Sequence, residues 1–118
     1  YAVGEGVKGV PLPVYHFKTA DEVHAFVVSP GNLKPVAPGI YISICKVPGN
    51  LLNDGVYNIT LDMVEHQKIS TVYHYSQVNY LNVTVQDSII DNPHRYNYGG
   101  PIPGVMRPIL DWDIKKVE

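Results

Sequence analysis

Five histidines, one cysteine and a few carboxylates are the residues of this chain that could carry chemistry. His16 and His24 flank a predicted hairpin turn, across which the two imidazoles could meet, but no third ligand accompanies them and no histidine pair has metal-ligand spacing. Cys45 lies inside an apolar run, which predicts a buried and inert thiol. We therefore expect no metal site, no cofactor and no Cys/His nucleophile.

The only close acidic pair that might mimic a glycosidase arrangement is Asp111 and Asp113, which flank Trp112. Two carboxylates on one strand face could mimic a glycosidase, but acidic residues beside a tryptophan near a chain end are more often a solvated edge. We favour the solvated edge, with Trp112 anchoring the last strand in the core. The chain has no G-x-S-x-G elbow, no P-loop and no dinucleotide-binding glycine motif. The sequence thus predicts a domain without catalytic residues.

What remains is a surplus of aromatic and amide side chains, including nine tyrosines. Amides, carboxylates and hydroxyls can hydrogen-bond sugar hydroxyls, while a flat ring packs on the C–H face of a sugar. The outward faces of two predicted strands carry such groups, although an ordinary polar strand surface would look the same. The residues predicted to bind carbohydrate are Asn58, Thr60, Asp62, Tyr80, Asn82, Thr84 and Gln86.

The elements that must position these residues are strands. The chain has 118 residues, enough for one domain over residues 1–118. Val, Ile and Thr total 31 residues and Leu and Ala only 11, and ten Gly and ten Pro punctuate the chain, which predicts an all-β protein. Short strands at fairly even spacing are typical of a sandwich or a barrel.

The alternation of apolar and polar residues, together with the positions of turn residues, predicts where the strands lie. A hairpin is expected over residues 14–17 and 23–28, and a strand with little solvent exposure over 40–47. In the strand over 56–63, Tyr57, Ile59, Leu61 and Met63 share one face. In the strand over 80–86, Leu81, Val83 and Val85 point inward and the residues between them outward. Residues 69–75 form a strand or an aromatic loop, and 105–114 a last strand restricted by Pro108.

The charge and composition of the chain exclude some classes of binding partner and favour one cellular compartment. The formal net charge is −2 and basic residues are scattered, which argues against nucleic acid. No apolar run approaches the roughly 20 residues of a membrane helix. The single cysteine cannot form an internal disulfide, so a reducing compartment, the cytoplasm, is favoured.

Two segments together resemble a known family. The first, residues 39–57, contains Pro48-Gly49-Asn50 and Asn53-Asp54-Gly55; the second, residues 98–113, contains Gly99-Gly100-Pro101. In this order and spacing they resemble the C-terminal domain of Wzt, the ATP-binding subunit of bacterial ABC transporters that export O-antigen polysaccharides. The resemblance implies an immunoglobulin-like antiparallel β-sandwich that binds the exported glycan at the cytoplasmic face of the inner membrane, as a homodimer linked to a transmembrane transporter subunit.

Two departures from the family pattern shape the expectations. The family domain begins some strands earlier than Tyr1, which predicts first strands that are missing or exchanged in a domain cut from a longer chain. Ile102 stands where the family often has an aromatic residue, and the Gly- and Pro-rich segments fit structural turns better than a binding loop. The alternative function is a structural dimerisation sandwich that binds no glycan.

Overall fold

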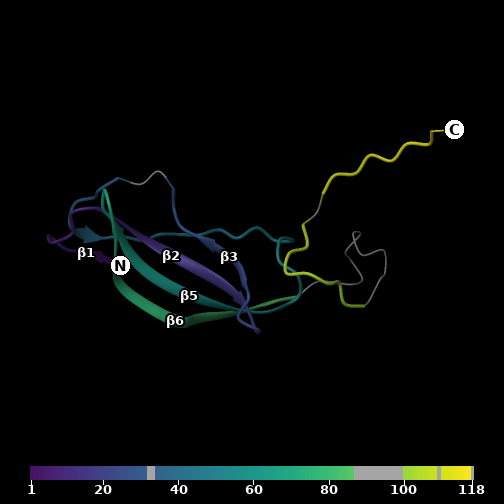
Figure 1. Cartoon of the computed structure of the whole chain (residues 1–118), viewed down its shortest axis with the longest axis horizontal. Helices are drawn as coiled ribbons and strands as arrows, with labels where there is room; N and C mark the ends of the chain where they lie inside the picture. Colours follow the sequence, from purple (N-terminus) through teal and green to yellow (C-terminus); the bar gives the residue numbers. More distant parts are fainter. Residues whose placement is uncertain (32–33, 87–99, 109, 118) are drawn as a thin grey trace.

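The computed structural model describes residues 1–31, 34–86, 100–108 and 110–117, and these ranges contain strands and no helix. The prediction of an all-β fold is confirmed (Figure 1). Accordingly, the described ranges contain no helix that could cross a membrane. The strands are β1 (Ala2–Val3), β2 (Val10–Thr19), β3 (His24–Val28), β4 (Gly39–Ile40), β5 (Gly55–His66) and β6 (Thr71–Val85).

The strands form two antiparallel sheets that face each other as in a β-sandwich. The larger sheet has the order β3-β2-β5-β6, and the smaller pairs β1 with β4. β6 is longer than predicted, because residues 69–75 and 80–86 were expected as separate segments and most of both lie in this one strand. The larger sheet carries most of the residues that the sequence predicted to bind carbohydrate, because these lie in β5 and β6.

The first predicted hairpin is confirmed by the pairing of β2 with β3. Its turn is closed by Thr19, whose Oγ1 accepts a hydrogen bond from the Val23 N–H at 3.1 Å and whose carbonyl accepts one from the Glu22 N–H at 2.9 Å. Glu22 takes a φ of 63°, the left-handed conformation that tightens such a turn. The turn places the start of β3 beside the end of β2.

The core lies on one face of the larger sheet. Alternation along β5 puts Tyr57 and Ile59 on this face, where they pack with Phe17 of β2 and with Leu52. Phe17 stacks on Phe26 of β3 with ring centroids 4.3 Å apart. The predicted face of the strand over 56–63 is therefore the inward face.

The buried strand expected over residues 40–47 is wrong. Only Gly39–Ile40 is a strand, and Ile42 and Ile44 are 87% and 79% exposed. The side chains of Tyr41 and Ser43 face the larger sheet, but nothing in the described residues covers the opposite side of the segment. Cys45 is exposed as well, contrary to the predicted buried thiol, although it lies on the side of the segment that faces Tyr15 of the larger sheet.

The last strand expected over residues 105–114 is also wrong. In the described part of this segment, pairing is limited to one isolated bridge between Leu52 and Met106. Residues 110–117 extend away from the sheets (Figure 1). Trp112 is 84% exposed and does not anchor a core strand, because no described element packs against this tail.

Described parts of the two segments that carried the family resemblance, residues 51–53 and 102–107, lie against each other. The Asn53 N–H donates to the Val105 carbonyl at 2.8 Å, and the Arg107 N–H donates to the Leu51 carbonyl at 2.8 Å. The Asn53 side chain is buried, and its Nδ2 donates to the carbonyls of Ile102 and, at 2.7 Å, Gly104. These contacts give the segments the structural role that their turn residues predicted.

Candidate functional site

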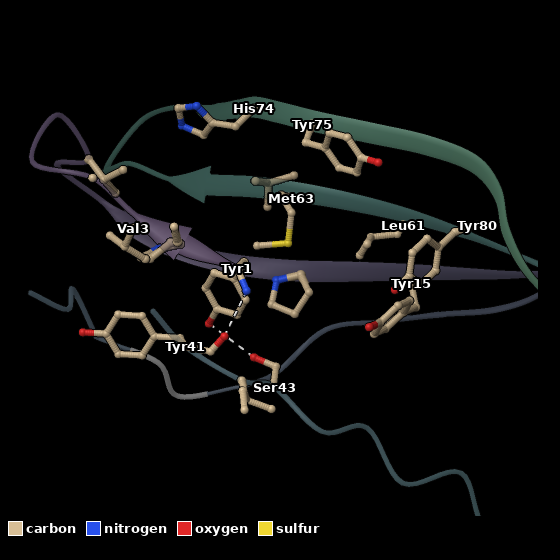
Figure 2. Close-up of a pocket in the computed structure, with 17 residues that line it drawn as sticks. Tyr1, Val3, Tyr15, Tyr41, Ser43, Leu61, Met63, His74, Tyr75 and Tyr80 are labelled. Atoms are coloured by element: carbon tan, nitrogen blue, oxygen red, sulfur yellow. Dashed lines mark hydrogen bonds between the residues drawn. The ribbon is translucent and has the colours of Figure 1, made fainter. Parts of the chain in front are cut away.

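A cavity of about 660 Å³ lies between the two sheets. Its volume is in the range of about 300–1,000 Å³ that is typical of small-molecule sites. Figure 2 shows side chains converging on it from the larger sheet and from the segment around Tyr41. Its lining is unusually aromatic and includes five tyrosines: Tyr1, Tyr15, Tyr41, Tyr75 and Tyr80.

The smaller sheet supplies one wall of the cavity. Tyr1 and Tyr41 stack with ring centroids 6.0 Å apart and an interplanar angle of 27°. The Tyr41 N–H donates to the Tyr1 carbonyl at 2.8 Å, and Ser43 Oγ donates to the Tyr1 hydroxyl at 3.2 Å (Figure 2). This wall therefore presents flat rings whose positions are fixed by hydrogen bonds.

The larger sheet supplies the opposite wall through Tyr15, Leu61 and Met63. Burial raises the pKa of Tyr15, and the neighbouring Tyr80 and Cys45 raise it further. The Tyr15 hydroxyl is therefore neutral at physiological pH and can both donate and accept a hydrogen bond. The wall combines apolar surface with a few polar groups, as ligand cavities do.

Tyr80 belongs to this wall, although simple alternation predicted that it points outward. Ile59 pairs with Leu81 while Leu61 pairs with Gln77, so three residues of β6 lie opposite the single Thr60. This irregularity contains Asn79, whose φ is 55°. The bulge breaks the alternation and turns Tyr80 toward the cavity, on the same side as its neighbour Leu81.

The other predicted carbohydrate-binding residues lie away from the cavity. Asn58 of β5 pairs directly with Asn82 of β6. Thr60 and Asp62 are buried, and both Asp62 carboxylate oxygens already have partners on other strands. The exposed predicted residues on this side are Asn82, Thr84 and Gln86, with Asn58 half-buried. Carbohydrate binding at this face stays a prediction.

Glu65, near the end of β5, is buried beside His74, and His74 lines the cavity. Hydrogen bonds from Gln67 and His74, followed by those from the Gly9 and Lys8 N–H groups, lower its pKa to about 2. The carboxylate is therefore ionised at physiological pH and holds the incoming chain before β2. The Glu65 carboxylate thus has a structural role, and its contact with His74 Nε2 at 3.0 Å orients that imidazole at the cavity.

The acidic pair near the chain end lies far from this arrangement. Asp111 and Asp113 are exposed in the tail, and Asp113 forms an ion pair with Lys115 at 3.3 Å. The solvated environment predicted for the pair is thus confirmed, although the tail is not a strand edge. Across the described ranges, no group of three or more His, Cys, Asp or Glu side chains could hold a metal ion.

Comparison with family models, curated proteins and solved structures finds no match to this chain. Sequence alternation placed the polar strand residues but missed the cavity, because its walls come from segments far apart in the chain. The high tyrosine content was the one sequence signal that pointed to it.

Proposed function

We propose that the domain recognises a polysaccharide without catalysis and that the tyrosine-lined cavity holds part of the glycan. The carrying observation is the convergence of five tyrosines on one cavity of about 660 Å³. Rings such as Tyr75 and Tyr80 offer flat apolar surface to the C–H faces of sugars, and their hydroxyls can exchange hydrogen bonds with sugar hydroxyls. Charge is not needed for such recognition.

The wider role is proposed from the sequence resemblance. In this view the domain is the immunoglobulin-like C-terminal domain of the ATP-binding subunit of an ABC transporter. It selects O-antigen or a similar glycan for export by holding it at the cytoplasmic face of the inner membrane, as a homodimer attached to the transmembrane subunit through the parent protein.

Titration calorimetry with the O-polysaccharide of the source organism tests the proposal. Tyr80→Ala removes a half-exposed ring from the cavity, while Asn82→Ala removes an amide from the outward face, two residues along the same strand. Because stacking of one aromatic ring contributes about 1 kcal/mol, Tyr80→Ala should weaken binding about fivefold. Asn82→Ala should leave the affinity unchanged.

The affinities of the two variants show whether the glycan binds in the cavity or on the outward face of the larger sheet. Loss of affinity only in Asn82→Ala would move the site to the outward face that the sequence predicted. An absence of binding by folded wild-type protein would contradict glycan recognition at either surface. Circular dichroism of each variant checks that the sheets are intact.

The second candidate function is dimerisation, and exposed apolar side chains favour it. Ile40, Ile42 and Ile44 alternate along one exposed segment, and Leu110, Trp112 and Ile114 alternate along the tail. Exposed alternating apolar residues in extended chain are suited to exchange of strands between two copies. Light scattering with and without polysaccharide discriminates: a dimer that ignores every glycan favours this function.

A further inference from the structure

His16 of β2 and His24 of β3 face each other on the side of the larger sheet away from the core. The pairing of Lys18 with His24, after a register shift at Phe17, brings the two imidazoles together. His16 Nδ1 lies 3.4 Å from His24 Nε2, and the rings meet edge to face with an interplanar angle of 60°. Two ring nitrogens on different strands are thus directed at each other.

The distance between His16 Nδ1 and His24 Nε2 fits two ligands of one metal ion better than it fits a hydrogen bond between the two rings. Ordinary N–H hydrogen bonds span about 2.7–3.2 Å between heavy atoms, so 3.4 Å is long for one. Two nitrogens that bind one tetrahedral zinc ion, each at about 2.0–2.1 Å, lie about 3.3 Å apart. His24 is exposed, so its ring is free to adjust its tilt toward a bound ion.

Neighbouring strands orient His16 for this role. Asp62 Oδ2 lies 3.0 Å from His16 Nε2, and Ser76 Oγ donates to Asp62 Oδ1 at 2.5 Å. A carboxylate that accepts the Nε2 proton leaves the Nδ1 lone pair available, which is the usual support of a metal-bound histidine. The order of these groups excludes a serine nucleophile, because Asp62 lies between Ser76 and His16.

We propose that His16 Nδ1 and His24 Nε2 form a surface site for a divalent transition-metal ion, with Zn²⁺ the best match. Imidazole nitrogen selects Zn²⁺, Cu²⁺ or Ni²⁺ over Mg²⁺ and Ca²⁺, which prefer oxygen. Water completes the coordination, since no cluster of three such ligands occurs in the described residues. The site revises the expectation from sequence that these histidines bind no metal.

Calorimetric titration of the whole chain with ZnCl₂ tests the site. Wild type should bind one Zn²⁺, and His24→Ala should raise the Kd at least tenfold. Asp62→Asn keeps both ligands but weakens the support of His16, so it should raise the Kd by about tenfold. His66→Ala is the matched control, because His66 is the last residue of β5 and contacts Thr71, whereas His16 pairs with Thr60 in the middle of that strand; the Kd of this variant should equal that of wild type.

Ring-nitrogen NMR provides a second readout that does not depend on affinity. His16 should carry its proton on Nε2, and Zn²⁺ should shift the Nδ1 signal of His16 and the Nε2 signal of His24. Equal Zn²⁺ affinity in wild type and His24→Ala would overturn the proposal, as would loss of binding in His66→Ala alone. A proton on Nδ1 of His16 in the zinc-bound protein would overturn it as well.

Discussion

Replacing Asn53 with alanine should destabilise the protein strongly, because this one side chain joins two distant segments. The amide is buried; its Nδ2 donates to the carbonyls of Ile102 and Gly104, and its Oδ1 accepts from the Asp54 N–H at 2.9 Å. Three hydrogen bonds at about 0.5–1.5 kcal/mol each give a loss of about 3 kcal/mol. For a domain of this size the melting temperature should fall by about 10 °C.

Urea denaturation measures the loss, with Asn82→Ala as the matched control because Asn82 is exposed on β6. The control should lie within about 0.5 kcal/mol of wild type. Hydrogen exchange adds a local readout. The Arg107 N–H, which donates to the Leu51 carbonyl at 2.8 Å, should exchange faster in Asn53→Ala.

Two results would refute this reasoning. If Asn53→Ala unfolds at the same urea concentration as Asn82→Ala, the amide does not hold the segments together. If stability falls but exchange at Arg107 is unchanged, the loss arises elsewhere. Asn53→Asp refines the test, because it keeps an acceptor for the Asp54 N–H but removes both donors, and it should be at least as destabilising as alanine.

Three further predictions concern the sheet and its ends. Because hydrogen bonds lower the pKa of Glu65 from 4.5 to about 2, its ionised form stabilises the fold above pH 4.5, and this stability is lost as the pH falls toward 2. Urea midpoints across this window should fall more steeply in wild type than in Glu65→Gln, and equal slopes would contradict the assignment. Gly9→Ala should destabilise by about 1–3 kcal/mol, because its Cβ would lie 2.1 Å from the His66 carbonyl oxygen. Thermal melts should separate it from Gly6→Ala, whose Cβ meets nothing within 4 Å, and equal melting temperatures would count against the clash. Phe17→Ala removes a buried core ring and should cost about 3 kcal/mol by urea denaturation, so a loss below 1 kcal/mol would show that this face is not the core.

Local patterns predicted the central strands but not their limits. Alternation of apolar and polar residues identified the strand around Ile59, and the turn after Thr19 located the first hairpin. The same reasoning misplaced Tyr80, because the bulge around Asn79 places Tyr80 on the same side as Leu81, whereas Val83 and Val85 keep the inward side that was predicted for them. A bulge depends on how two strands pair, and the sequence of one strand does not reveal it.

Apolar runs predict buried strands, and the prediction is wrong where no second element covers the run. The run that includes Ile42 and Ile44 has the composition of an interior strand, yet only one of its sides meets the larger sheet. Trp112 is likewise apolar and exposed. The hydrophobicity of a run indicates how much its burial would stabilise the fold. The run is buried only where another element of the structure packs against it.

The sequence by itself determined the all-β class, the inward face of β5 and the structural use of the Asn53-Asp54-Gly55 turn, because these follow from side-chain period and backbone preference over a few residues. Only the tertiary structure decided which residues share a site. It brought Tyr1, Tyr41 and Tyr80 to one cavity, and it placed Asp62 and Ser76 behind His16, whereas the meeting of His16 with His24 was already expected from the hairpin. Such groupings depend on strand register and sheet packing, which join positions far apart in the chain and leave no local signal in the sequence.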